Sequence, residues 1–209
     1  MSFRKEKKFR LSISDFHQLQ SLLISQGMST LHEPRIINSL YYDTPNLIMF
    51  HNSEEGVLPR KKIRIRWYNK NLNFIVEKKI SSIEGRFKTI TPLGQYKNVM
   101  PLVSNNIELN FPVRSFFDEI YGFLIPTLLV SYKRAYFEFK KIRITFDSKI
   151  TYKNLRISNQ IKIEDTERVM EVKFGIDNGD DLLENLIPYT SSRFSKYSRG
   201  ILFTNKNNK

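Results

Sequence analysis

The stretch IRIRWY at residues 63–68 places an arginine at every second position, with an apolar residue on either side of each. On a β-strand, residues two apart point to the same face. Arg64 and Arg66 therefore share one face, roughly 6–7 Å apart, and the apolar residues share the other. Two like charges at that distance repel by about 2–3 kcal/mol at an effective dielectric near 20. Such a strand predicts a polyanion against its charged face.

Further stretches repeat this alternation with mostly cationic charges: RKEKK at 4–8, EKK at 77–79, Arg134 with Arg143, and EVK at 171–173. If all the charged faces point into a barrel, its interior gathers these cations together with three carboxylates. The cations are Arg4, Lys8, Arg64, Arg66, Lys79, Arg134, Arg143 and Lys173, and the carboxylates are Glu6, Glu77 and Glu171. Arginine and lysine in that density suit phosphate groups. The carboxylates can either neutralise neighbouring cations or hold a divalent metal that bridges phosphates.

The composition is that of a folded protein with an anionic partner. The 209 residues suit one domain, residues 1–209 with a polar tail at 205–209, and 40% of them are hydrophobic. A net charge of +13 favours nucleic acid, a membrane surface or a phosphorylated ligand. The lack of cysteine excludes disulfides and thiol chemistry and fits a reducing, cytoplasmic location. No apolar run approaches the length of a membrane span, and no signal peptide is recognisable.

The apolar pattern predicts about eight strands and few helices, mostly in hairpin order. We expect strands at 3–13, 35–42, 61–68, 73–80, 86–90, 127–139, 142–150 and 166–174, and helices at 113–123, 180–186 and 194–203. A further helix follows the first strand, capped by Ser14 and ended by Gly27. Residues 46–56 fit either a loop or a short helix. The predicted class is α+β, an eight-stranded antiparallel β-barrel with a few flanking helices.

Two other interpretations of the charged strands stand beside a phosphate-binding barrel. An antiparallel sheet with one solvated face also alternates apolar and charged residues. A nucleic-acid groove combines cations with aromatic side chains that stack on bases. Against the second, Phe9, Trp67 and Phe137 fall out of phase with the charges, so they cannot stack on a ligand among those cations.

Short motifs along nearly the whole chain resemble, in order, those of the VTC domain. This is the catalytic domain of polyphosphate polymerases, within the triphosphate tunnel metalloenzyme superfamily. The motifs are RKEKKF at 4–9, SLYYD at 39–43, IRIRWY at 63–68, FIVEKK at 74–79, YKR at 132–134, RITFD at 143–147, MEVK at 170–173 and FSKY at 194–197. Each is weak alone, and the ordered set is specific.

The resemblance implies a tunnel of eight antiparallel strands in which the γ-phosphate of ATP is transferred to inorganic polyphosphate, with Mn²⁺ or Mg²⁺. It implies ATP and polyphosphate as partners and no nucleic acid. Glu171 matches the metal-binding carboxylate. The catalytic positions are Arg64, Arg66, Lys79 and Lys196, and the phosphate-binding positions are Arg4, Lys8, Arg64, Arg66, Lys79, Arg134, Arg143, Lys173, Ser195 and Lys196. Arg193 stands where a lysine is common, and Arg86 and Lys88 are further contacts on weaker alignment.

Two related functions remain open. The hydrolase and cyclase branch of the superfamily carries Glu-x-Glu-x-Lys on its first strand, whereas this chain has Arg4 in the first position. That difference argues against an inorganic triphosphatase. A non-catalytic polyphosphate-binding or regulatory domain is the other alternative. Glu171 and Lys196 together argue against it, because a binder needs no metal carboxylate.

Overall fold

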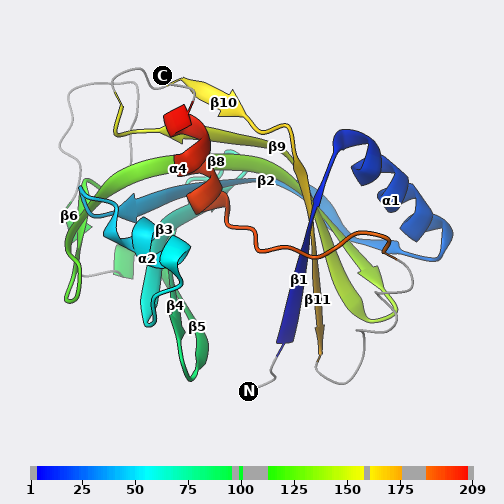
Figure 1. The fold of residues 1–209 in the computed structure, drawn as a ribbon, viewed down its shortest axis with the longest axis horizontal. Coiled ribbons are helices and arrows are strands. Elements are labelled where there is room, and N and C mark those ends of the chain that lie inside the picture. Colours follow the sequence, from blue (N-terminus) through cyan, green and yellow to red (C-terminus); the bar gives the residue numbers. More distant parts are fainter. Residues whose placement is uncertain (1–3, 96–98, 101–112, 158–160, 176–186, 207–209) are drawn as a thin grey trace. The chain divides into compact units, whose positions relative to one another are not determined.

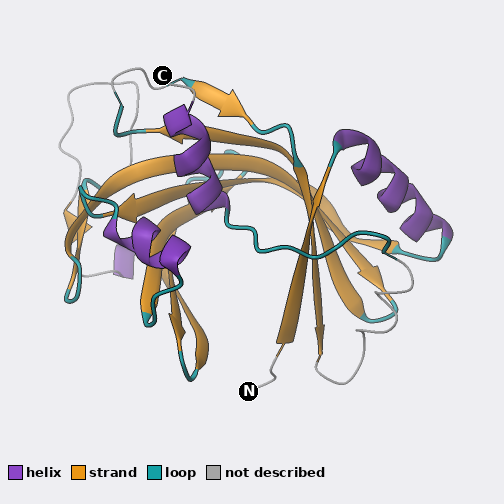
Figure 2. Cartoon of the chain, in the orientation of Figure 1, coloured by secondary structure: helices purple, strands orange, loops and turns teal. Residues whose placement is uncertain are grey.

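The computed structural model describes residues 4–95, 99–100, 113–157, 161–175 and 187–206. Most of them lie in strands (Figures 1 and 2). Eight strands join in one sheet in the order β1 (Arg4–Leu11), β11 (Arg168–Gly175), β9 (Ile142–Asn154), β8 (Gly122–Phe139), β2 (Ser29–Asp43), β3 (Arg60–Tyr68), β4 (Ile75–Ser82) and β5 (Gly85–Pro92). The strand pairs with a described register are antiparallel. The predicted α+β class with an eight-stranded antiparallel sheet is therefore confirmed, and closure around a tunnel stays a prediction.

The chain divides into two compact units, and the long strands β2, β8 and β9 contribute to both. Unit 1 contains Met1–Ile36, Ser131–Thr151 and Glu164–Ser195, and unit 2 contains Ile37–Val130, Tyr152–Ile163 and Lys196–Lys209. The single domain expected from the length stays a prediction.

In unit 1, strands β1, β11 and β9 bury one face against helix α1 (Ile13–Ser25), which lies alongside them in Figure 1. Phe9, Ile144 and Val172 from the three strands pack with Phe16 and Leu19 of the helix. Because side chains alternate along each strand, the opposite face carries the even-numbered residues of β1 and the odd-numbered residues of β9 and β11. The charged residues predicted for this region therefore share one face.

Helix α1 begins earlier than the sequence indicated. Ser12, not Ser14, is the N-cap, since its hydroxyl accepts a hydrogen bond from the backbone N–H of Asp15 at 3.1 Å. The prediction for Ser14 was wrong because both serines precede an apolar run and either could cap it. The other end is as expected: Gly27 follows the helix with φ of 99°, a left-handed conformation that favours glycine.

In unit 2, strands β2 to β5 form consecutive antiparallel pairs, and β2, β3 and β4 share one apolar face. Leu40, Ile63, Ile65 and Val76 are almost fully buried there. They pack with Phe116 of β7 (Ser115–Asp118), which pairs with β6 (Val99–Met100) and with the start of β8. The face with Arg64 and Arg66 is the other one, as the alternation predicted.

The helix expected at 113–123 was wrong, because this segment is a β-hairpin. Phe116 pairs with Leu124 and Phe117 with Phe123, and the backbone N–H of Ile120 donates to the Asp118 carboxylate in the turn. The spacing that resembled a helical face instead leaves Phe117, Ile120 and Phe123 exposed. Only the first phenylalanine enters the core.

Two helices of unit 2, α2 (Ile48–Glu55) and α4 (Lys196–Lys206), lie next to each other (Figure 1). The first resolves the open choice at 46–56 in favour of a helix. The second lies close against the sheet at Gly200, where a Cβ atom would come within 2.5 Å of Leu128 and 2.6 Å of Tyr152. Glycine thus permits the helix to approach the strands.

Two predicted helices lie in the C-terminal part of the chain. The helix predicted at 180–186 lies outside the described residues. The one predicted at 194–203 is confirmed as α4, which begins at Lys196 and continues to Lys206. The polar tail expected at 205–209 stays a prediction. A 3₁₀ turn, Leu93–Gln95, follows β5, and a short strand β10, Lys162–Glu164, pairs with β9. Within the described ranges, no helix is both long and apolar enough to cross a membrane.

Candidate functional site: two basic sheet faces

The polar face of β2 to β5 carries seven cations and one buried carboxylate in adjacent rows. The register sets Arg64 opposite Tyr41 and Glu77, and it sets Lys79 opposite Lys62 and Lys88. We call this surface the unit 2 basic face; its charged members are Arg60, Lys62, Arg64, Arg66, Glu77, Lys79, Arg86 and Lys88. The predicted gathering of Arg64, Arg66 and Lys79 on one face is confirmed within this unit.

Glu77 is the centre of this face. Its carboxylate accepts a hydrogen bond from Nε of Arg64 at 2.6 Å and one from Nζ of Lys88 at 2.5 Å, and it lies 3.3 Å from Nη1 of Arg66. Only 1% of Glu77 is exposed. Burial would raise the pKa of Glu77, but the charges of Arg64, Arg66 and Lys88 outweigh burial and lower it to about 2. Of the two roles open to the carboxylates, Glu77 performs the first: it neutralises and aligns the cations.

Away from Glu77 the basic face continues toward the β4–β5 turn. Lys79 and Arg86 are exposed there, and Ser81 lies opposite both Arg60 and Arg86 in the register. No carboxylate interrupts these last rows of the face. Lysines near solvent can reorient toward a mobile anion, whereas the arginines beside Glu77 are fixed.

A tyrosine network that the sequence did not predict links α4 to this face. The hydroxyl of Tyr41 accepts a hydrogen bond from Nη1 of Arg64 at 2.7 Å, and its ring stacks on Tyr197 of α4 at 5.0 Å between centroids. Tyr197 donates in turn to the Asp43 carboxylate at 2.5 Å. Asp43 also accepts from the backbone N–H groups of Met49 and Phe50 at the start of α2. The network thereby fixes both helices to Arg64.

Unit 1 has a second, mixed-charge face. Glu171 on β11 lies opposite Lys8 on β1 and Thr145 on β9, and Lys173 lies opposite Glu6. Nζ of Lys173 is 2.8 Å from Glu171 and 3.5 Å from Glu6, and Lys8 contacts Glu6 at 3.0 Å. We call these residues, with Arg134, Arg143 and Asp147, the unit 1 polar face.

Buried ion pairs hold this face in place. Arg134 donates to both oxygens of Asp147, at 2.6 and 2.7 Å, and lies 3.8 Å from Glu171. Burial would lower the pKa of Arg134, but the carboxylate of Asp147 raises it above its usual range. Burial would raise the pKa of Glu171 too, but Arg134, Lys173 and Lys8 hold it far below its ordinary value. Glu171 is therefore ionised at neutral pH.

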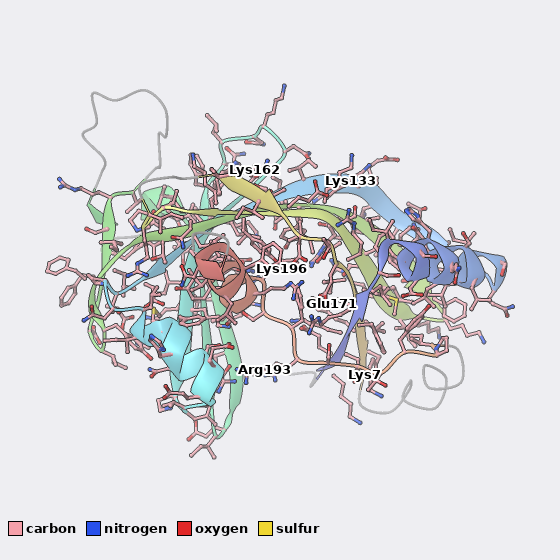
Figure 3. All side chains as sticks on the ribbon, turned by 45° about the horizontal axis from the view of Figure 1, so that its top comes forward. Lys7, Lys133, Lys162, Glu171, Arg193 and Lys196 are labelled. Atoms are coloured by element: carbon pink, nitrogen blue, oxygen red, sulfur yellow. The ribbon has the colours of Figure 1, made fainter. Side chains whose placement is uncertain are left out.

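The remaining predicted residues have less defined roles. Arg143 is exposed and lies 5.6 Å from the Tyr136 ring, in a cation–π contact. The side chain of Arg4 falls outside the described residues, although its backbone pairs with Gly175. Ser195 belongs to unit 1, and Lys196 is the first residue of α4 in unit 2. Figure 3 labels Lys196 at that helix end, Glu171 on β11 and Arg193 on the preceding segment. A single surface shared by both units stays a prediction.

Comparison with known proteins places the chain in a family and a fold. A family model described as the VTC domain matches residues 3–205. A proposed adenylate cyclase from Bacillus halodurans has a similar structure, with a TM-score of 0.56 at 16% identity over 95% of this chain and 97% of that one. A proposed adenylyl cyclase from Hippeastrum, described as having a dominant triphosphatase activity, has a TM-score of 0.55 at 16% identity, covering 96% of each chain. The PH1819 protein from Pyrococcus horikoshii, also 16% identical, reaches 0.51 over 97% of this chain and 99% of its own. Such identities show a shared fold, and a comparison with curated proteins gives no match.

Proposed function

Because the chain belongs to the VTC domain family, we propose that it is a polyphosphate polymerase, which transfers the γ-phosphate of ATP onto a growing polyphosphate chain. The observation that carries this proposal is the unit 2 basic face. There, one buried carboxylate, Glu77, aligns Arg64, Arg66 and Lys88 side by side. A row of guanidinium groups held by one carboxylate and continued by Lys62 and Lys79 in the next row matches a chain of phosphates better than a single anion.

Phosphoryl transfer requires mainly that the protein positions the phosphates and stabilises their negative charge. In phosphoryl transfer a loose transition state spreads negative charge over the equatorial oxygens, so catalysis is mainly positioning and electrostatic stabilisation. The attacking group is an oxygen of the terminal phosphate of the chain, already ionised at neutral pH, so a general base is not required. Its new bond to the γ-phosphorus replaces the bond to the β–γ bridging oxygen, and ADP leaves. Arg64 and Arg66 would bind and orient phosphates, and Lys196 would stabilise the transferring group.

A divalent metal would supply further neutralisation of phosphate charge, and Glu171 is the residue that we assign to it. The described residues contain no cluster of three or more carboxylate or histidine side chains that could hold an ion alone. Glu171 with Glu6 nearby instead suits an ion held by one or two carboxylates and by phosphate oxygens, the arrangement that Mg²⁺ commonly adopts. The donor set fits a metal that arrives with its nucleotide.

An inorganic triphosphatase of the same fold is the second candidate function. The observation that favours it is the pair of carboxylates Glu6 and Glu171, which share Nζ of Lys173 and could hold a metal together. Arg4 argues against it, since it replaces a further acid on the same strand. Water as acceptor gives free phosphate, whereas phosphate as acceptor gives polymer.

The test is to incubate the purified protein with ATP and Mn²⁺, and to measure polymer on a gel and released phosphate in the same samples. We expect polymer that lengthens with time. Arg66→Ala should abolish it, and Arg10→Ala, which removes an exposed cation paired with Glu167, should not. Phosphate without polymer, from inorganic triphosphate in a parallel sample as well as from ATP, would establish the triphosphatase. Neither product, together with tight polyphosphate binding, would establish a binding domain.

A further inference from the structure

One buried hydroxyl on the unit 1 polar face has no partner within the described part of the chain. Thr145 is 3% exposed, and its Oγ1 atom makes no hydrogen bond to any described residue. Burying a hydroxyl without a partner is unfavourable, so nearly all such groups in folded proteins are satisfied. A hydroxyl without a protein partner in a charged surface is a candidate donor to a ligand.

The surroundings of Thr145 define what that ligand is. Thr145 lies on β9 between Arg143 and Asp147 and directly opposite Glu171, which lies opposite Lys8 on the next strand. The neighbours of Thr145 in the sequence, Ile144 and Phe146, are buried in the core on the other face. The hydroxyl therefore belongs to the same surface as the cations of unit 1.

The charges of the unit 1 polar face favour an anion as the acceptor for this hydroxyl. Each carboxylate beside Thr145 already has a cation: Asp147 binds Arg134 through both oxygens, and Glu171 binds Lys173 at 2.8 Å. The face also carries Lys8 and Arg143, so its described cations outnumber its described carboxylates and it keeps a net positive charge. A hydroxyl donates a strong hydrogen bond to an ionised oxygen. A phosphate oxygen accepts a hydrogen bond from the hydroxyl and carries the negative charge that the cations attract.

We propose that Thr145 is a phosphate-binding residue, whose hydroxyl donates to a non-bridging oxygen of the bound triphosphate or polyphosphate. This inference rests on the proposed function and adds a neutral donor to its cations. The hydroxyl has no partner among the described residues and gains one from the ligand, so Thr145 contributes to ligand binding rather than to the packing of the sheet.

A role in binding predicts an effect of Thr145→Val that a purely structural role would not produce: lower affinity without lower stability. Valine keeps the shape and removes the unsatisfied hydroxyl, so the melting temperature of the free variant should equal or exceed that of the wild type. Its affinity for inorganic tripolyphosphate, measured by calorimetry, should fall about 10- to 100-fold, the worth of a hydrogen bond to a charged group. Thr145→Ser keeps the donor and should keep the affinity.

Thr127→Val is the matched control. Thr127 is equally buried, but its hydroxyl donates to the carbonyl of Ile125 at 2.9 Å, so this variant should lose stability and keep its affinity. If Thr145→Val melts well below the wild type, or binds tripolyphosphate as tightly, the inference is overturned. If the wild type itself binds no tripolyphosphate, the proposed function fails first, so the two failures are distinguishable.

Discussion

Glu77 and Arg64 face each other across β3 and β4, and the carboxylate of Glu77 accepts from Nε of Arg64 at 2.6 Å in a nearly dry environment. Because Arg66 and Lys88 contact the same carboxylate, this pair sets the geometry of the central rows of the unit 2 basic face. The repulsion expected between Arg64 and Arg66 is therefore balanced at this point, although the rows beyond Glu77 remain cationic.

Glu77→Gln should destabilise the free protein by about 3–5 kcal/mol, because it leaves buried cations without a counter-charge. Chemical denaturation measures this free energy. Glu167→Gln removes a carboxylate from the more exposed pair with Arg10 and should cost less than about 1 kcal/mol. Equal losses for the two variants would contradict a central role for Glu77.

The same pair predicts a pH dependence. The pKa of Glu77 is lowered from an ordinary 4.5 to about 2, so its contribution to stability is complete above pH 4.5 and is lost as the pH falls toward 2. The difference in unfolding free energy between wild type and Glu77→Gln should be constant from pH 5 to 7 and narrow below that. A difference independent of pH down to 2 would show that the carboxylate is not the cause.

Tyr197→Phe should loosen α4 without removing its stacking on Tyr41. The variant loses a buried hydrogen bond to the Asp43 carboxylate, so we expect a cost of about 1.5–3 kcal/mol in unfolding free energy. The control is Tyr189→Phe, which removes the corresponding bond to Asp15 at a partly exposed position. A loss no larger than that of the control would mean that Asp43 is satisfied by the backbone of α2 alone.

Arg66→Ala and Lys196→Ala should separate binding from rate. Arg66 is 7% exposed on a core strand, so its loss should weaken tripolyphosphate binding by about 10- to 100-fold. Lys196 begins α4, and we expect its loss to lower kcat far more than affinity. Arg199→Ala removes another cation from the same helix and should change neither. If Arg66→Ala and Lys196→Ala change affinity and kcat in the same way, Lys196 is an ordinary phosphate ligand.

Glu171→Gln should abolish metal-dependent turnover, because it removes the carboxylate that we assign to the ion. Calorimetric titration of Mn²⁺ in the presence of a non-hydrolysable ATP analogue should show weaker metal binding. Glu164→Gln, at an exposed carboxylate paired with Arg168, should bind Mn²⁺ as the wild type does. Unchanged Mn²⁺ affinity in Glu171→Gln would assign Glu171 to the cations around it instead.

Strand faces were predictable from the sequence wherever a strict alternation existed. In the stretch around Arg64 the alternation determines which face is apolar and buried and which is charged. Burying Ile63 and Ile65 leaves the arginines only the opposite face. The segment around Phe116 was wrongly predicted to be a helix, because the spacing of its apolar residues fits a helix as well as a hairpin. The turn at Asp118 decides between the two.

The site was predictable in its charges and not in its long-range contacts. The bond between Tyr197 and Asp43 spans 154 positions in the chain and follows from the packing of α4, which no local pattern encodes. The isolation of the Thr145 hydroxyl likewise depends on what surrounds it in space. The role of Glu77 could have been suspected, because a lone acid in a cationic row is the natural counter-ion.

The most direct test of a phosphate-chain site is the melting temperature of the protein in tripolyphosphate compared with sulfate at equal ionic strength. A polyanion that binds only the folded state should add roughly 2.7 kcal/mol at about 100 times its dissociation constant. We predict a clear excess shift with tripolyphosphate, which Arg64→Ala combined with Arg66→Ala removes. A shift no larger than that of sulfate would contradict the account.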